Sequence, residues 1–229
     1  MTTILIATRN AHKVSEIRAI LGAQFQFLTL ADFPDAPKTI EDADTFAGNA
    51  TKKAVELAGW IVSKDAAESL PDFVLADDSG LEVDALNGAP GVYSARFAAM
   101  DAKDNAPDAD NNAKLLRLLK NVSAEKRTAR FRCVIALTSV HSNKIESASP
   151  VCYADGLAPE TPVFDGNCEG RILFEPRGKN GFGYDPLFVP NGFDGTFAEL
   201  GEDAKNKLSH RANALEKLKA FFMSNNKDL

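Results

Sequence analysis

The sequence of 229 residues predicts an α/β protein. Over residues 1–80, strand-like runs alternate with segments of helical periodicity in the order β-α-β-α-β. This order is typical of a sheet that carries functional groups at the carboxyl ends of its strands. The middle of the chain contains hairpin-like segments, and a long amphipathic helix follows them. The length suffices for one well-buried domain, or for one domain with two lobes.

The first elements are predicted by local patterns. Runs rich in β-branched or aromatic residues predict strands at residues 3–8, 25–30 and 72–79. Apolar residues at helical spacing predict helices over 12–21 and 45–60. Gly22 is a plausible stop for the first helix, and Thr45 is a possible cap for the second. The third strand is expected to end at the adjacent carboxylates Asp77 and Asp78.

Later elements follow in a less regular order. We expect a loop over 101–113, a helix over 114–122, strands over 129–140 and 144–156, and a last helix over 208–225. Residues 169–190 are dense in glycine and aromatic residues, which suggests a shaped loop rather than packing. We expect one domain over residues 1–229, with a hairpin-rich lobe at roughly 122–190 and an insertion at 64–72.

Composition restricts the class of partner. The net charge of −6 gives no basic field to attract a nucleic-acid polymer. The three cysteines lack C-x-x-C spacing, which favours reduced thiols. No segment approaches the roughly 18 apolar residues of a membrane span, and the N-terminus has no signal-peptide pattern. We therefore expect a cytoplasmic protein that binds a small molecule, without a nucleic-acid or membrane partner.

The segment "ATRNAHK", residues 7–13, is a candidate phosphate site. A turn from strand to helix offers backbone N–H groups and the positive end of the helix dipole to an anion. Thr8 adds a hydroxyl and Lys13 adds a positive charge. An ordinary turn, with Asn10 as helix cap and a solvated lysine, explains the same residues.

Adjacent carboxylates suggest a cation site. Neighbouring side chains on a strand point to opposite faces, so one of Asp77 and Asp78 can face a cleft while the other is structural. A carboxylate beside phosphates is repelled unless a hard cation such as Mg²⁺ lies between them. Glu41, on a loop before a helix, is available as a second ligand. The alternative is a set of solvated or turn-capping acids.

Two further segments could recognise a nucleobase. In "GFGYDP", residues 181–186, Phe182 lies between two glycines and could stack on a base. In "KNKLSHR", residues 205–211, side chains of Lys205, His210 and Arg211 are placed at the start of the last helix and could donate to a base carbonyl. A core phenylalanine and a capped, solvated helix start are the alternatives.

Six segments together resemble the inosine triphosphate pyrophosphatase family. They read "ATRNAHK", "TFAGNATKKA", "LADDSGLEVDALNGAPGVYSARFA", "EGRI", "GFGYDP" and "SHRANAL". Their order and spacing match the family from about residue 4 to residue 221. The resemblance implies an elongated, two-lobed α/β fold around a long mixed β-sheet flanked by helices. It also implies a homodimer and Mg²⁺-dependent release of pyrophosphate from ITP, dITP and XTP.

Carried over by position, the resemblance assigns residues to three tasks. Those expected to hold the triphosphate are Thr8, Arg9, Asn10, Ala11, His12, Lys13 and Lys53. Those expected to contact the rest of the substrate are Ser79, Phe182, Gly183, Tyr184, Asp185, Lys205, His210 and Arg211. Glu41 and Asp78 would bind the metal, and Asp78 would also act as the base for the water that attacks the α-phosphorus.

The sequence departs from the family pattern at one position. The family's helix usually reads F-x-E-N-A, and "FAGNA" places Gly48 where the acid stands. Two other hypotheses compete with the assignment. One is a pyrophosphatase that resembles the septum-formation inhibitors and acts on modified pyrimidine or methylated nucleotides. The other is a nucleotide-binding module without turnover.

Overall fold

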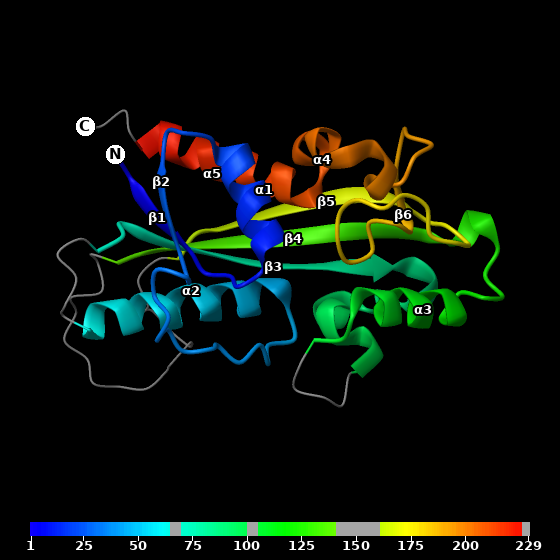
Figure 1. Ribbon diagram of the computed structural model, residues 1–229, viewed down its shortest axis with the longest axis horizontal. Helices are drawn as coiled ribbons and strands as arrows, with labels where there is room; N and C mark the ends of the chain where they lie inside the picture. The colour runs from blue at the N-terminus through cyan, green and yellow to red at the C-terminus, as the bar shows by residue number, and fades with distance from the viewer. Residues whose placement is uncertain (65–69, 100–104, 141–160, 226–229) are drawn as a thin grey trace. The chain divides into compact units, whose positions relative to one another are not determined.

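The computed structural model describes residues 1–64, 70–99, 105–140 and 161–225 (Figure 1). Its strands are β1 (Thr3–Ile6), β2 (Gln26–Thr29), β3 (Phe73–Val83), β4 (Thr128–Ser139), β5 (Val163–Ile172) and β6 (Phe188–Pro190). Its α-helices are α1 (Ala11–Leu21), α2 (Phe46–Ser63), α3 (Asp108–Leu118), α4 (Phe197–Leu208) and α5 (His210–Asn225). The strands form a mixed sheet of order β2-β1-β3-β4-β5-β6, which confirms the α/β class.

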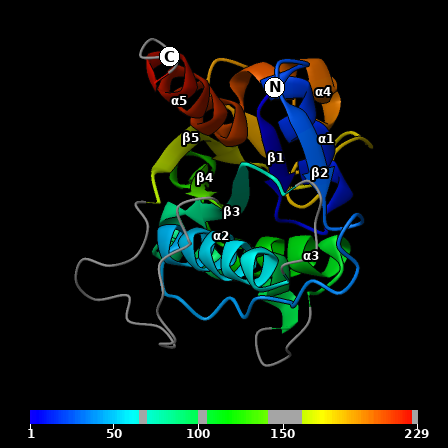
Figure 2. The same ribbon diagram turned by 90° about the vertical axis from the view of Figure 1, so that its left-hand side faces the viewer.

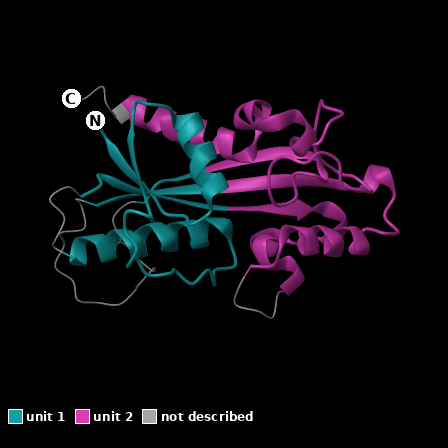
Figure 3. Cartoon of the chain, in the orientation of Figure 1, with its two compact units in different colours: residues 1–78, 134–164 teal, residues 79–133, 165–229 magenta. Residues whose placement is uncertain are grey.

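The chain divides into two compact units, coloured separately in Figure 3. Unit 1 contains residues 1–78 and 134–164, and unit 2 contains residues 79–133 and 165–229. Strands β3, β4 and β5 contribute residues to both units. Within the part of the chain that is described, no helix combines the length and apolar composition that a membrane crossing needs.

Unit 1 contains a parallel arrangement of β1 with its two neighbours. Ile4 is in register with Phe27 of β2 and with Phe73 of β3. Helices α1 and α2 lie on the two sides of these strands (Figures 1 and 2). As the sequence predicts, α1 stops at Gly22, which has a φ of 76°, and α2 is capped by Thr45.

Unit 2 has its own apolar core. Strands β5 and β6 pair antiparallel, with Arg171 in register with Val189. Gly166 on β5 permits a close approach of α5, because a Cβ there would lie 2.1 Å from the carbonyl oxygen of His210. The core side chains come from β3, β4, β5, α3 and the 184–197 segment, and include Leu81, Leu115, Phe131, Ile172, Leu187, Phe188 and Phe197.

Strand β3 is longer than the sequence predicts. The prediction that it ends at Asp77 and Asp78 is wrong, because it continues to Val83. Leu81 and Val83 are fully buried, so their apolar burial favours continued strand beyond the two carboxylates. The backbone N–H of Leu81 also donates to Ser94 Oγ at 2.9 Å. The two carboxylates are therefore interior to a strand, with no turn after them.

Two other predictions need correction, and a third is not tested. Helix α3 begins at Asp108 and ends at Leu118, whereas the sequence suggested a loop to 113 and a helix over 114–122. Its early start fits the acidic first turn, which favours the positive end of the helix dipole. The expected loop over 169–190 begins inside β5 and ends in β6. The expected strand over 144–156 lies outside the described residues, as do most of the 64–72 insertion and the first part of the 101–113 loop.

Candidate active site

Unit 1 brings two lysines onto the adjacent carboxylates of β3. The Lys53 Nζ lies 3.0 Å from Asp78 Oδ1 and 3.1 Å from Glu41 Oε2. It also donates to the carbonyl oxygen of Asp77 at 3.1 Å. The Lys13 ammonium forms an ion pair with the Asp77 carboxylate, which is fully buried. The two lysines thus neutralise two like charges that would otherwise be buried side by side.

In this cluster, burial raises the pKa values of the Asp78 and Glu41 carboxyl groups, whereas the nearby lysines lower them. Burial raises the pKa of Asp78, and the charge of Glu41 adds to the rise, while Lys53 and Lys13 oppose it. Burial alone would raise the pKa of Glu41, but the charge and hydrogen bond of Lys53 lower it. The carboxylates of Asp78 and Glu41 outweigh desolvation at Lys53 and raise its pKa. The two acids therefore differ, with Asp78 the more basic.

Glu41 and Asp78 fit a shared divalent cation. Their carboxylates already share one cation, the Lys53 ammonium, and carboxylate oxygens are the ligands that Mg²⁺ prefers. Across the described ranges, no group of three or more His, Cys, Asp or Glu side chains is placed to hold a metal ion. Two carboxylates plus oxygens from phosphate and water match the way Mg²⁺ is usually held.

The turn before α1 is organised by a helix cap. Asn10 Oδ1 accepts hydrogen bonds from the backbone N–H groups of His12 at 2.9 Å and Lys13 at 3.2 Å. Thr8 Oγ1 accepts from the Asn10 N–H at 3.2 Å. Arg9 donates to the Ala36 carbonyl at 2.9 Å, and Ala11 is exposed. The cap thus uses two of the N–H groups that the sequence offered to a phosphate, while the Lys13 side chain reaches Asp77.

Unit 2 contains a buried ion pair beneath an aromatic ring. Lys205 Nζ lies 2.6 Å from Asp185 Oδ2, and both side chains are almost completely buried. The same ammonium lies 4.1 Å from the centre of the Phe182 ring, which is a cation–π distance. Asp185 Oδ2 also accepts from the Phe182 N–H at 2.9 Å. Asp185 and Lys205 together therefore fix the position of Phe182.

Glycine is required in this turn. Gly181 has a φ of 78°, and a Cβ there would lie 2.3 Å from Asp185 Oδ2. The Gly183 N–H donates to Asp108 Oδ2 at 2.6 Å. Tyr184 is buried, its hydroxyl donates to the Ser94 carbonyl at 2.8 Å, and burial raises its pKa. The Tyr184 hydroxyl is thus engaged with the protein's own backbone.

The start of α5 carries two more expected residues. His210 stacks on Phe131 with 4.8 Å between ring centres, and Arg211 Nη2 donates to Ser79 Oγ at 3.2 Å. Both side chains are nearly fully buried. The sequence placed Lys205 at the start of this helix, but it lies near the end of α4, which the sequence analysis missed. Ser79 on β3 and His210 and Arg211 at the start of α5 therefore lie on the elements expected, and Lys205 alone lies on a different one.

Sequence reasoning also missed Asn49. This side chain is 1% exposed, and its Nδ2 donates to Asp78 Oδ2 at 3.2 Å. The signal was present in "FAGNA", where the residue follows Gly48 by one position and precedes Lys53 by four. Residues four apart lie on the same face of a helix, which is why Asn49 and Lys53 both reach Asp78.

The structure gives a physical reading of Gly48. Thr45 caps α2 by accepting from the Gly48 N–H at 3.0 Å, so Gly48 is the third residue of the helix. A glutamate at this position would be the partner in a capping box. In this chain a Cβ at position 48 would lie 2.8 Å from the Cβ of Ala43, which therefore packs directly on the glycine.

Gly48→Ala is expected to lower the free energy of unfolding, whereas Gly59→Ala is expected to raise it by about 0.5–1 kcal/mol. Both glycines lie within α2, but a Cβ at Gly59 would meet nothing within 4 Å, whereas one at Gly48 would meet Ala43. Urea unfolding of the two variants measures the difference. Equal gains in stability would show that Ala43 does not rest on Gly48.

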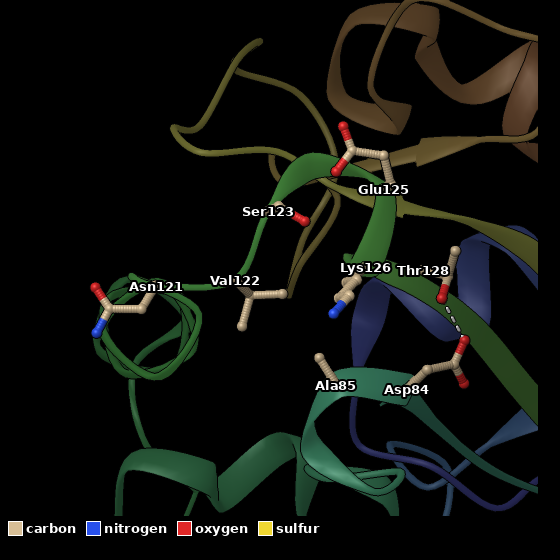
Figure 4. Close-up of a pocket in the computed structure, with 8 residues that line it drawn as sticks. All are labelled: Asp84, Ala85, Asn121, Val122, Ser123, Glu125, Lys126 and Thr128. Atoms are coloured by element: carbon tan, nitrogen blue, oxygen red, sulfur yellow. Dashed lines mark hydrogen bonds between the residues drawn. The ribbon is translucent and has the colours of Figure 1, made fainter.

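Unit 2 also contains a surface pocket, which is lined by residues outside the predicted site. Its volume is about 770 Å³ (Figure 4). The residues that line it are Asp84, Ala85, Asn121, Val122, Ser123, Glu125, Lys126 and Thr128. It contains none of the predicted site residues, and its acidic and basic side chains define no single ligand charge. The chemistry described above is therefore distinct from this pocket.

The chain is similar to known proteins over nearly its whole length. A family model described as the Ham1 family matches residues 4–221. A dITP/XTP pyrophosphatase from Desulforamulus reducens is 46% identical over 215 residues, which cover 93% of this chain and 92% of that protein. Its counterpart from Geobacter sulfurreducens is 47% identical over 220 residues, covering 96% of each chain. The solved structure of a HAM1 protein from Coxiella burnetii has a TM-score of 0.76 at 36% identity, and covers 98% of this chain and 100% of that one.

Proposed function

The chain belongs to the Ham1 family, and on this premise we propose that it hydrolyses ITP, dITP and XTP to the monophosphate and pyrophosphate. The match also confirms the family resemblance that the sequence motifs carry. The observation that supports the reaction most directly is the buried Asp78 carboxylate, held by Lys53 beside Glu41. By family membership we also infer that the protein acts as a homodimer in the cytoplasm.

Asp78 is proposed as the base that orients and deprotonates the attacking water. The carboxylate is buried, and Lys53 fixes one of its oxygens at 3.0 Å, so its other oxygen can be aimed at the water. Mg²⁺, when held by Glu41 and Asp78, would neutralise charge on the triphosphate oxygens. The protein's own contribution is then the position of the water relative to the α-phosphorus.

Lys13 and Lys53 are proposed to offset the charge of the leaving pyrophosphate. Both ammonium groups are bound to carboxylates in the structure, which keeps them at defined positions. The 8–13 turn adds the positive end of the α1 dipole, at which Asn10 already accepts from the N–H groups of His12 and Lys13. Charge that is held in place before the reaction stabilises the transition state without reorganisation.

The unit 2 residues are proposed to recognise the purine. Phe182 would stack on the base, because Asp185 and Lys205 hold its ring and backbone in place. Lys205, His210 and Arg211 would supply donors for the 6-carbonyl oxygen of hypoxanthine or xanthine. Adenine has a 6-amino group instead, and a site built on such donors rejects the mismatch by about 10⁴–10⁵.

A product assay tests the proposal. The protein is incubated with Mg²⁺ and, separately, ITP, dITP, XTP, GTP, ATP and TTP, and the products are separated by ion-exchange chromatography. We expect monophosphate and pyrophosphate from the first three and little product from the others. Preference for a pyrimidine would assign the chain to the septum-formation-inhibitor type of pyrophosphatase, and tight binding without turnover would make it a binding module.

A further inference from the structure

We propose that Asn49 is a positioning residue that orients the Asp78 carboxylate and fixes the Glu41 segment against α2. The inference rests on the proposed function, because the orientation of Asp78 affects activity only if Asp78 and Glu41 take part in the reaction. Asn49 belongs neither to the expected substrate-binding set nor to the expected metal ligands. Its role follows from three contacts of one buried carboxamide.

The carboxamide of Asn49 binds both the backbone and the carboxylate. Its Oδ1 accepts from the Ala43 N–H at 3.0 Å, and its Nδ2 donates to the Ala43 carbonyl at 3.2 Å. The second hydrogen of Nδ2 is donated to Asp78 Oδ2, with 3.2 Å between the nitrogen and the oxygen. A carboxamide has two donor hydrogens on nitrogen and acceptor lone pairs on oxygen, so these contacts use each donor once.

These contacts permit one orientation of the amide. Turning it over would place Oδ1 against the oxygens of Ala43 and Asp78, and Nδ2 against the Ala43 N–H. Two acceptors or two donors would then face each other in a site where Asn49 is 1% exposed. Buried polar groups without a complementary partner are costly, so the donor must point at Asp78.

Asn49 and Lys53 hold the two oxygens of Asp78 separately. Lys53 Nζ donates to Oδ1 at 3.0 Å, and Asn49 Nδ2 donates to Oδ2 at 3.2 Å. Both side chains also hold the segment before α2, Lys53 at the Glu41 carboxylate and Asn49 at the Ala43 backbone. One face of α2 therefore sets the rotation of Asp78 and the distance between Asp78 and Glu41.

The neutral amide is suited to this task. A carboxylate held by a second cation would lose affinity for a metal ion, whereas an amide donor fixes its geometry without adding charge. Because Gly48 has no Cβ, Ala43 can pack directly against it. Changing Asn49 to aspartate keeps the size and the acceptor for Ala43 but replaces the donor at Asp78 with a negative oxygen.

The chain offers a matched control in Asn111. This asparagine is 2% exposed, accepts from the Ala98 N–H at 2.8 Å and donates to the Ala95 carbonyl at 3.2 Å. It thus holds backbone through a buried carboxamide as Asn49 does, and its partners among the described residues are backbone groups of Ala95, Ala98 and Ala106. Asn111→Asp should cost stability in a similar way without changing the geometry at Asp78.

The experiment compares Asn49→Asp, Asn49→Ala and Asn111→Asp with the parent protein on ITP. We expect Asn49→Asp to lower kcat/KM by about 10–100-fold and to raise the Mg²⁺ concentration for half-maximal rate by a similar factor. Asn49→Ala, which adds no charge, should shift both in the same direction by less. Asn111→Asp should change neither, although its melting temperature falls. Equal effects of Asn49→Asp and Asn111→Asp would overturn the proposal.

Crystal structures of the same variants give a readout that does not depend on turnover. In Asn49→Asp, the Asp78 carboxylate should rotate away from position 49, and residues 41–43 should move from α2. An unchanged Asp78 in that variant would contradict the proposed role. If the parent protein hydrolyses none of the nucleotides, the proposed function fails, and these structures still decide whether Asn49 orients Asp78.

Discussion

Asp78→Asn should lower kcat for pyrophosphate release from ITP by about 10²–10⁴-fold. The substitution keeps the size of the side chain but removes the negative charge and the proton acceptor that the proposal assigns to it. Lys53 would still contact Glu41 and the Asp77 carbonyl, so we expect the fold to persist. Steady-state rates at saturating ITP and Mg²⁺, with circular dichroism to confirm folding, measure the effect.

Asp72→Asn is the control for this result. Asp72 directly precedes β3, and its Oδ2 accepts from the Thr3 N–H at 2.8 Å, which an asparagine oxygen can also do. This variant removes one negative charge from unit 1 without touching Asp78, and its kcat should stay within about twofold of the parent. A folded Asp78→Asn protein with a rate close to that of Asp72→Asn would remove Asp78 from the mechanism.

Lys205→Met should lower the free energy of unfolding by about 3–5 kcal/mol. The Lys205 and Asp185 side chains are 5% and 2% exposed, so removal of the ammonium leaves a buried carboxylate without its counter-charge. The Phe182 ring also loses the cation 4.1 Å from its centre. Urea unfolding monitored by circular dichroism measures the loss, and the affinity for ITP should fall with it.

Lys217→Met provides the comparison at an exposed ion pair. Lys217 lies 2.7 Å from Asp165, with side chains 54% and 60% exposed, so its removal should cost about 0–1 kcal/mol. Adding Asp185→Asn to Lys205→Met should recover part of the lost stability, because the isolated buried charge disappears. Similar losses for Lys205→Met and Lys217→Met would mean that the Asp185 carboxylate is reached by water.

Much of the first part of the fold could be predicted because its signals are local. Asn10, Gly22 and Thr45 mark helix ends through contacts within a few residues, and the structure places α1 and α2 accordingly. Helix α4 escaped prediction because Gly201, with a φ of 81°, interrupts its helical pattern. Its capping box, Thr196 with Glu199, was a signal that could have located its start.

The end of β3 could not be predicted from its own residues. Asp77 and Asp78 suggest a turn when they are considered alone, but Lys13 and Lys53, distant in sequence, neutralise them inside a buried strand. The candidate ligands Glu41 and Asp78 lie beside one ammonium, that of Lys53. Their roles in binding and catalysis stay predictions.

Asn49 shows a second limit of sequence reasoning. Its acceptor role is set by the backbone of Ala43, and backbone partners leave no mark on residue type. The buried pair of Lys205 and Asp185 is similar, because its two members are close in space but lie on different segments. Such contacts depend on how segments pack, which a pattern of single residues does not specify.

The most direct test of the central claim is hydrolysis of ITP in water enriched in ¹⁸O, with mass spectrometry of both products. If water attacks the α-phosphorus, the inosine monophosphate carries one ¹⁸O and the pyrophosphate carries none. Label in the pyrophosphate would place the attack on the β-phosphorus, and labelled orthophosphate would place it on the γ-phosphorus. Either of these results would contradict the mechanism built on Asp78.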